Sequence, residues 1–409
     1  MLEAASLRIC AIAMLGITAC ATTHPGVGAA SSSRMSPLPP ATSSPTLESV
    51  PTAAPPPPAS RARQACPQSQ SAASFEPRPP SSRNLALVTL KGTDSYAVRD
   101  VTDIDHPFTV GTLGGLKPIS GPKAAYAMQF VGGTAVSYYG DDGRLVRKTF
   151  DGTPVVVTKP CNGVFAVAWT PDGATLAYVT DSADYADGQM HLVTRGRDSF
   201  FGAVPAVPIT GCVPPCDEFV DIRASFSPDG RYLTFNSYWR VTLHIWSLDG
   251  RLLEAIDAED PQYPHAGPTM SVWSGSGYFF RDGRGVEVWR NGVLSLTLPG
   301  VAWIRPKASP TTTQIVYEAK DKSDVPSVYV LDSVSGATRV VARLRSEPVF
   351  LNGRFIWYRG ERLCAANDPY PCGAEGTIGT GKTYVYDLVS GAESESIISD
   401  VWDVWPHAA

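Results

Sequence analysis

Three kinds of signal are missing from this chain of 409 residues. Its 34 Lys and Arg are outnumbered by 39 Asp and Glu, which gives a formal net charge of −5 and no basic excess for nucleic acid. Its first apolar run, residues 9–17, is shorter than the roughly 20 residues of a membrane-spanning helix. No segment has the apolar spacing of a long amphipathic helix. The sequence therefore gives no support to a nucleic-acid-binding, membrane-spanning or helical protein.

Aromatic residues are almost absent between residues 21 and 83. This stretch holds 14 of the 36 Pro but only one aromatic residue, Phe75. Such a composition buries too little apolar surface to offset the entropy lost on folding. We interpret residues 20–83 as an anchor cysteine followed by a disordered linker rich in Pro, Ser and Ala, and residues 84–409 as the folded domain.

The start of the chain resembles a bacterial lipoprotein signal. Arg8 precedes the apolar run, and Ile17-Thr18-Ala19-Cys20 is similar to a lipobox. The resemblance implies that residues 1–19 are a signal peptide and that Cys20 becomes the diacylated N-terminus. We therefore expect an exported, membrane-anchored lipoprotein that faces the periplasm or the cell exterior. A simple cleaved signal without a lipid is the alternative.

Six cysteines lie beyond the signal and Cys20, at Cys66, Cys161, Cys212, Cys216, Cys364 and Cys372. An even number in an exported chain favours disulfides, although six cysteines allow 15 pairings. Cys212–Cys216 and Cys364–Cys372 are close in sequence and are the preferred local pairs, which leaves Cys66–Cys161. Zinc is the rival at the first pair, but no second thiol pair or His pair lies near it. We expect no metal and no cofactor.

An aromatic residue closes a short apolar run just before a turn at seven positions, which are Phe130, Trp169, Phe226, Trp273, Trp303, Phe350 and Trp405. The successive gaps are 39, 57, 47, 30, 47 and 55 residues, with a mean of about 46. A repeat of about 40–50 residues that contains several short strands is typical of a β-propeller.

The clearest copies of the repeat run from Val167 to Tyr178 and from Ala224 to Phe235. In each, an apolar strand leads into Pro-Asp-Gly, where Pro sets φ and Gly accepts a positive φ, and an alternating strand follows. Two further strands follow, as in residues 243–248 and 251–256. Each repeat thus holds four strands, the number in a propeller blade.

This Ser-Pro-Asp-Gly unit, with the strands around it, resembles the WD40-like repeat of the TolB-like β-propeller family, over most of residues 85–409. The resemblance implies an all-β ring of small sheets. It also implies a periplasmic interaction scaffold, because related proteins act in that way.

We count seven four-stranded blades, with six as the alternative because only 30 residues separate Trp273 from Trp303. Residues 85–113 hold three strands without an inner strand, and residues 401–405 form an inner strand with nothing after it. We predict that these two segments pair and close the ring, because an open ring exposes strand edges.

Strand order places the long insertions on one side of the ring. In an antiparallel blade, the loop between the second and third strands and the connection to the next blade share one face, which we call the loop face. The first turn of each blade lies on the opposite face, the turn face. The insertions at residues 181–188, 205–219, 257–267 and 360–382 should therefore lie together. Long loops on a rigid scaffold commonly carry binding, so we predict that the loop face is functional.

Charged and aromatic residues of these loops are the candidates for ligand contact, namely Asp184, Asp187, Asp257, Asp260, Tyr263, His265, Arg359 and Arg362. The run Asp181, Asp184, Asp187 could offer oxygens to calcium, but its spacing is not that of an EF-hand. Ordinary solvated surface is the alternative for all of these residues.

One pattern imitates a nucleotide site. Gly376, Gly381, Lys382 and Thr383 match the phosphate-binding pattern G-x-x-x-x-G-K-[ST]. That chemistry requires a strand before the loop and a helix N-terminus after it. Here a Cys-containing loop precedes the pattern and a strand over residues 384–388 follows it. We expect a flexible Gly/Thr loop and no nucleotide.

Two functions remain open. None of the six His stands beside an obvious nucleophile, and no G-x-S-x-G elbow occurs. The first hypothesis is a non-catalytic, lipid-anchored propeller that binds a protein or a cell-envelope polymer through the loop face. The alternative is a propeller enzyme (a lyase, lactonase or glycan hydrolase) acting at the channel mouth, where Asp184, Asp260 and His265 would have to converge.

Overall fold

The computed structural model describes most of one compact unit, Ala62–Ala409. The described residues are 67–90, 95–113, 128–140, 142–161, 163–180, 187–205, 222–237, 241–258, 271–275, 277–282, 285–290, 293–299, 303–365, 368, 376–398 and 400–407. The predicted signal peptide, the anchor Cys20 and most of the predicted linker lie outside them. None of the described residues belongs to a helix long and apolar enough to span a bilayer.

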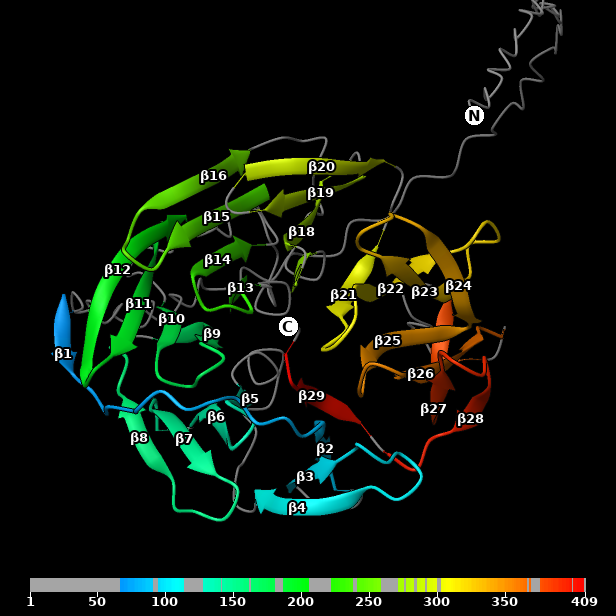
Figure 1. Cartoon of the computed structure of the whole chain (residues 1–409), viewed down its shortest axis with the longest axis horizontal. Coiled ribbons are helices and arrows are strands. Elements are labelled where there is room, and N and C mark those ends of the chain that lie inside the picture. The colour runs from blue at the N-terminus through cyan, green and yellow to red at the C-terminus, as the bar shows by residue number, and fades with distance from the viewer. Residues whose placement is uncertain are drawn as a thin grey trace, which may run out of the picture. The chain divides into compact units, whose positions relative to one another are not determined.

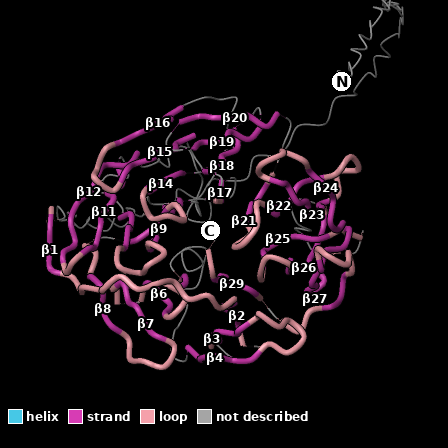
Figure 2. The backbone as a smooth tube through the Cα atoms, in the orientation of Figure 1, coloured by secondary structure: helices cyan, strands magenta, loops and turns pink. Residues whose placement is uncertain are grey.

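Seven antiparallel sheets surround a central axis, and Figure 1 looks along that axis. Figure 2 shows only strands and loops in the described part of the chain. The fold is a seven-bladed β-propeller. The predicted fold class and blade count are confirmed, and the six-bladed alternative is wrong.

Six blades have four strands and blade 3 has a fifth, and the strands follow sequence order from the axis outward except for β29, which closes the ring, and β1, which is added to blade 3. Blade 1 contains β29 (Val401–Trp405), β2 (Leu85–Thr89), β3 (Tyr96–Asp100) and β4 (Phe108–Leu113). Blade 2 contains β5 (Gln129–Val131), β6 (Ala135–Tyr139), β7 (Leu145–Thr149) and β8 (Val155–Thr158). Blade 3 contains β9 (Val164–Trp169), β10 (Leu176–Thr180), β11 (Asp187–Thr194), β12 (Arg197–Pro205) and, at its outer edge, β1 (Ser69–Ser71).

The remaining four blades follow the same order. Blade 4 contains β13 (Ile222–Phe226), β14 (Tyr232–Ser237), β15 (Val241–Ser247) and β16 (Leu252–Ala258). Blade 5 contains β17 (Ser271–Ser274), β18 (Gly277–Asp282), β19 (Gly285–Arg290) and β20 (Val293–Pro299). Blade 6 contains β21 (Ile304–Ala308), β22 (Gln314–Lys320), β23 (Pro326–Asp332) and β24 (Thr338–Arg343). Blade 7 contains β25 (Arg345–Phe350), β26 (Phe355–Leu363), β27 (Thr377–Asp387) and β28 (Glu393–Glu395).

The two sharp copies of the repeat form matching turns between the first and second strands. Gly173 and Gly230 both have a φ of 68°, which favours glycine because a side chain would be strained there. Asp172 and Asp229 each accept a hydrogen bond from the hydroxyl that starts the turn at 2.6 Å and one from a backbone N–H at 3.0 Å. The Pro-Asp-Gly pattern therefore defines the turn locally.

The C-terminal strand closes the ring as predicted. β29 pairs with β2 in antiparallel register, with Trp405 opposite Leu85 and Asp403 opposite Leu87. The indole of Trp405 is buried, and its Nε1 donates a hydrogen bond to the Ser81 carbonyl at 2.9 Å. The C-terminal strand thus completes blade 1 beside β2, the first strand of the ring.

One aromatic residue of the predicted repeat is misplaced. Trp303 precedes β21, and Ala308 occupies the position that Phe226 has in blade 4. Trp303 is fully buried and packs against the ring of Tyr317, with centroids 5.8 Å apart. The interval between Trp273 and Trp303 is short because of this misassignment. Blade 5, which lies in that interval, has all four strands.

The N-terminal segment, residues 67–84, belongs to the propeller and not to the linker. β1 extends blade 3 by pairing with β12. Farther along, the N–H groups of Arg78 and Ser81 donate to the carbonyls of Asp172 and Gly132, both 3.1 Å away. Those carbonyls lie in the first turns of blades 3 and 2, so the N-terminal segment crosses the turn face, as the blue trace between β1 and β2 in Figure 1 shows. The folded domain begins well before the predicted boundary at residue 84.

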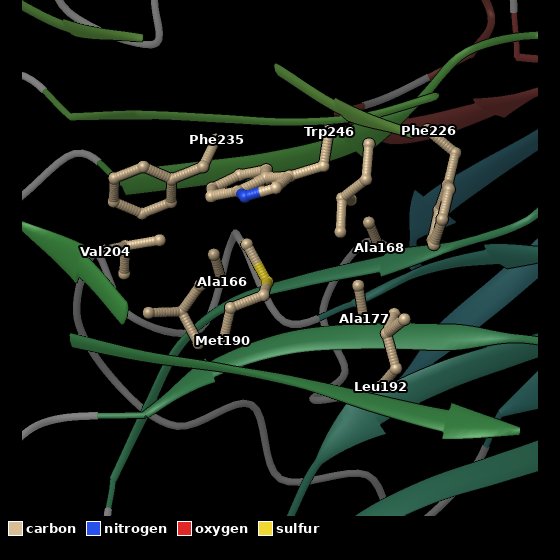
Figure 3. Close-up of a cluster of buried hydrophobic side chains, with 11 residues drawn as sticks. Ala166, Ala168, Ala177, Met190, Leu192, Val204, Phe226, Phe235 and Trp246 are labelled. Carbon is tan, nitrogen blue, oxygen red and sulfur yellow. The ribbon is translucent and has the colours of Figure 1, made fainter. Parts of the chain in front are cut away.

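The core lies between neighbouring blades, because each sheet buries both of its faces. Figure 3 shows the contact between blades 3 and 4, where Met190 and Val204 of one sheet face Phe235 and Trp246 of the other. Small side chains such as Ala168 on β9 let the two sheets approach near the axis, where the blades converge. This packing fixes the positions of the inner strands.

Candidate functional site

The seven inner strands enclose a central channel with a volume of about 750 Å³. That volume lies within the roughly 300–1,000 Å³ typical of ligand pockets. Each inner strand starts at a blade connection on the loop face and ends at the first turn on the turn face. The position of a residue along its strand therefore gives its depth in the channel.

The turn-face end of the channel is lined by aromatic and tail residues, including Trp169, Phe226, Trp405, Pro406 and His407. Asp403 accepts a hydrogen bond from the Phe130 N–H at 2.7 Å and lies 3.0 Å from His407 Nε2. Pro80 of the N-terminal segment also lines the channel. The N-terminal segment and the C-terminal tail thus both line the turn-face end of the channel.

The loop-face end, which we call the channel mouth, combines an exposed aromatic ring with charged groups. Arg359 Nε lies 3.1 Å from Glu347 Oε2, and its Nη2 lies 3.1 Å from Asp400 Oδ1. The side chain of Arg359 is still 40% exposed. Trp402 is also 40% exposed, while its Nε1 donates to Thr89 Oγ1 at 2.6 Å. The lining of the mouth therefore includes an oriented indole on blade 1 and an ion-paired guanidinium on blade 7.

A buried carboxylate organises the adjacent wall. Glu318 Oε2 lies 3.2 Å from Arg305 Nη1 and accepts a hydrogen bond from the Glu347 N–H at 3.1 Å. Its side chain is only 6% exposed. Arg305 and Glu347 both have a φ of 51° and both precede a proline, at matching positions of β21 and β25. A left-handed backbone at a residue that precedes proline is unfavourable and indicates that the surroundings hold it in place.

The structure places two of the predicted ligand residues in different environments. Arg359 lines the channel mouth, whereas Arg362 makes two hydrogen bonds to Asp368, at 2.7 and 2.6 Å. These hydrogen bonds lower the pKa of Asp368 to about 2. Arg362 thus stabilises the tip of the β26–β27 hairpin.

The other ligand candidates stand at the loop face or lie outside the described residues. Asp187 begins β11 and Asp257 lies near the end of β16, so both stand at the loop face. Asp184, Asp260, Tyr263 and His265 lie outside the described residues. The convergence that the enzyme hypothesis requires therefore stays a prediction. Among the described residues, no group of three or more His, Cys, Asp or Glu could hold a metal ion.

The phosphate-binding pattern lies in a strand and not in a flexible loop. Thr377 to Thr383 form the first part of β27, which pairs with β26. Lys382 Nζ forms an ion pair with Glu395 Oε2 at 2.7 Å. Within the described part of blade 7 the pattern leads into a strand and not into a helix. It therefore lacks the N–H groups of a helix N-terminus that bind phosphate in such sites. The expected flexible loop is wrong.

Two of the predicted disulfide cysteines lie within the described residues. Cys161 and Cys364 are both disulfide-bonded, and their partners are not among the described residues. Gln70 Nε2 donates to the Lys159 carbonyl at 3.0 Å, which places the N-terminal segment close to Cys161. Cys66, Cys212, Cys216 and Cys372 lie outside the described residues, so the pairing stays a prediction.

A buried polar cluster between blades 2 and 3 was not predicted. Asp198 is fully buried and accepts hydrogen bonds from Tyr178 and Thr158, each at 2.6 Å, and from Gln70 at 2.8 Å. His191 Nδ1 lies 3.1 Å from its other oxygen. Burial, together with the carboxylate, raises the pKa of the Tyr178 hydroxyl. Asp198 follows a tight turn and looks like a surface residue, so its sequence neighbours give no sign of this cluster.

No family model and no curated protein matches this chain. Among solved structures, dipeptidyl peptidase 4 from Porphyromonas gingivalis is 13% identical with a TM-score of 0.45, covering 76% of this chain and 50% of its own. Prolyl oligopeptidase B from Galerina marginata is 11% identical with a TM-score of 0.48, covering 81% and 50%. TolB from Acinetobacter baumannii is 15% identical with a TM-score of 0.37, covering 78% and 80%.

This chain thus spans half the length of the two peptidases that it matches. Identities and TM-scores this low assign neither a family nor an activity. The assignment as a propeller rests on the seven described sheets.

Proposed function

We propose that this protein is an exported lipoprotein whose propeller binds a protein partner or a cell-envelope polymer at the channel mouth, without catalysing a reaction. One observation carries the proposal. The mouth on the loop face presents Trp402 and Arg359 to solvent, while the N-terminal segment crosses the turn face.

The chemistry of the mouth suits macromolecular recognition. Trp and Arg are enriched among the residues that dominate binding energy at interfaces. The hydrogen bond to Thr89 and the ion pairs of Arg359 hold both side chains in place before a partner arrives, which lowers the entropy lost on binding. The disulfides at Cys161 and Cys364 support export, because disulfides persist in oxidising compartments.

Replacing Trp402 by Ala is expected to weaken partner binding about 30-fold, because a central interface aromatic contributes about 2 kcal/mol or more. The measurement is the affinity of the purified propeller for the partner enriched from envelope fractions. Val389→Ala is the matched control, since Val389 is 79% exposed in a turn of blade 7 on the turn face. Equal affinity of Trp402→Ala and the unmodified protein would contradict binding at the mouth.

A further inference from the structure

We propose that a cleft on the turn face, between blades 4 and 5, binds a segment of a neutral glycan. The cleft has a volume of about 450 Å³, which lies within the roughly 300–1,000 Å³ typical of ligand pockets. It lies on the opposite face from the channel mouth, so this inference goes beyond the proposed function.

The first turns of blades 4 and 5 form the two walls of this glycan cleft. Asp229, Arg231 and Tyr232 come from blade 4, and Trp273 and Gly277 come from blade 5. On the turn face, the backbone of the N-terminal segment is hydrogen-bonded to the first turns of blades 2 and 3. No described residue of that segment lines the glycan cleft, so the segment leaves this part of the turn face uncovered.

Two nearly parallel aromatic rings form the apolar part of the cleft. The ring centroids of Tyr232 and Trp273 lie 6.4 Å apart at an interplanar angle of 14°. The indole Nε1 of Trp273 donates a hydrogen bond to Thr234 Oγ1 of blade 4 at 3.1 Å, which fixes the ring. Both rings are only partly buried. Aromatic faces attract groups that carry partial positive charge, such as the C–H groups on one face of a sugar ring.

An ion pair supplies hydrogen-bonding groups beside these rings. Arg231 Nε lies 2.5 Å from Asp229 Oδ2, and the two side chains are 66% and 45% exposed. The guanidinium carbon of Arg231 lies 5.5 Å from the centroid of the Tyr232 ring. Among the described residues, the Nη groups of Arg231 make no hydrogen bond, so their N–H donors can reach a ligand.

The fold does not require these side chains. Blade 3 forms the same first turn, with an aspartate that accepts the same two hydrogen bonds. In blade 3, however, Ala174 and Thr175 stand where blade 4 has Arg231 and Tyr232. Since the turn forms without an arginine, the turn does not explain Arg231, whose side chain is mostly exposed. Contact with a ligand does explain it.

The chemistry of the ligand follows from the ion pair. Asp229 and Arg231 carry opposite charges in contact, so the pair offers little net attraction for a phosphate or a carboxylate. Arg290 also lines the cleft, but it makes a contact of its own. A sugar hydroxyl both donates and accepts, so neighbouring hydroxyls can bond to the carboxylate and the guanidinium together.

A proline-rich peptide fits this cleft less well. Its prolines offer carbonyl acceptors to Arg231 but have no N–H to donate to Asp229. Gly277 has a φ of 143°, and a Cβ there would lie 2.5 Å from the Trp289 carbonyl oxygen, so that wall carries no side chain. The cleft thus combines an aromatic surface, a neutral pair of donor and acceptor, and open space, which together suit a sugar ring.

The test measures the binding of neutral trisaccharides (chitotriose, cellotriose and maltotriose) to the purified full-length protein by titration calorimetry. At least one should bind. Arg231→Ala and Tyr232→Thr, which resemble blade 3, should each weaken that binding about 10-fold, because they remove hydrogen bonds from a charged donor or an aromatic contact. Arg354→Ala is the matched control and should bind normally. Arg354 likewise pairs with a carboxylate, Asp387, and lies over the Phe355 ring, but in blade 7.

Thermal melting of each variant shows whether its fold is intact. Absence of binding by all of the trisaccharides, or equal binding by either variant with its fold intact, would overturn the site. Tighter binding of trigalacturonate or of decaproline through Arg231 would overturn the assignment to a neutral glycan. Because the glycan cleft lies outside the channel mouth, these outcomes leave the expected effect of Trp402→Ala unchanged, and the two proposals fail separately.

Discussion

Replacing Asp198 by Ala is expected to lower the free energy of unfolding by about 3–5 kcal/mol, because it removes one partner from a fully buried, charged cluster. Four groups lose their acceptor at once, including the Tyr178 hydroxyl and the Gln70 amide. Since Gln70 belongs to β1, the loss should also loosen the N-terminal segment from blade 3.

Urea denaturation measures this effect directly. Glu395→Ala is the matched control, because Glu395 is 59% exposed and its carboxylate pairs with Lys382 at the surface, where such pairs contribute about 0–1 kcal/mol. A loss of less than 1 kcal/mol for Asp198→Ala, on the order of the control, would show that the cluster does not hold the blades together.

The same residue gives the stability a defined pH dependence. Burial opposes the charged form, but hydrogen bonds from His191, Gln70, Thr158 and Tyr178 outweigh it, so the pKa of Asp198 in the folded protein lies below its ordinary value of 3.8. A depressed pKa means that the stabilisation is present above the unfolded-state pKa and is lost as pH falls below it. Asp198→Asn should therefore lose less stability between pH 5 and pH 3, roughly the window around that value, than the unmodified protein.

Replacing Cys20 by Ala is expected to release the protein from the membrane almost completely. A diacylated cysteine contributes about 0.8 kcal/mol for each buried CH₂ group, and two acyl chains together give stable anchoring. The measurement combines metabolic labelling with a radioactive fatty acid and fractionation of membranes. Cys10→Ala is the control, because Cys10 lies in the predicted signal peptide and should leave both readouts unchanged. Retention of Cys20→Ala in the membrane with normal labelling would show that Cys20 is not the anchor.

Local signals explain why the fold could be predicted. The Pro-Asp-Gly turns depend on residues within a few positions of Gly173 and Gly230, and their spacing marks successive blades. Closure by residues 401–405 followed from counting strands at the two ends. Blade 6 has Ala308 where the repeat expects an aromatic residue at the end of the inner strand. The sequence pattern therefore predicts Trp303, which precedes that strand, at this position instead.

Long-range contacts explain what could not be predicted. Composition alone assigned residues 67–83 to a linker, because their main partners, such as the carbonyls of Asp172 and Gly132, lie far along the chain. Asp198 gains its role only when β1 and β8 approach β12. The sequence predicts Arg359 from its place in a long loop. It gives no sign of Arg305 and Glu318, because the register shift in β21 and the burial of Glu318 appear only when β21 and β22 pair.

Site-specific photocross-linking in the intact envelope tests the central claim most directly. A photoreactive phenylalanine analogue would replace Trp402 at the channel mouth or Val389 on the turn face, and adducts would be compared after irradiation. Binding at the mouth predicts a strong adduct at position 402 and little or none at position 389. A strong adduct at position 389 with none at position 402 would contradict the account, because the partner would then contact the face that the N-terminal segment crosses.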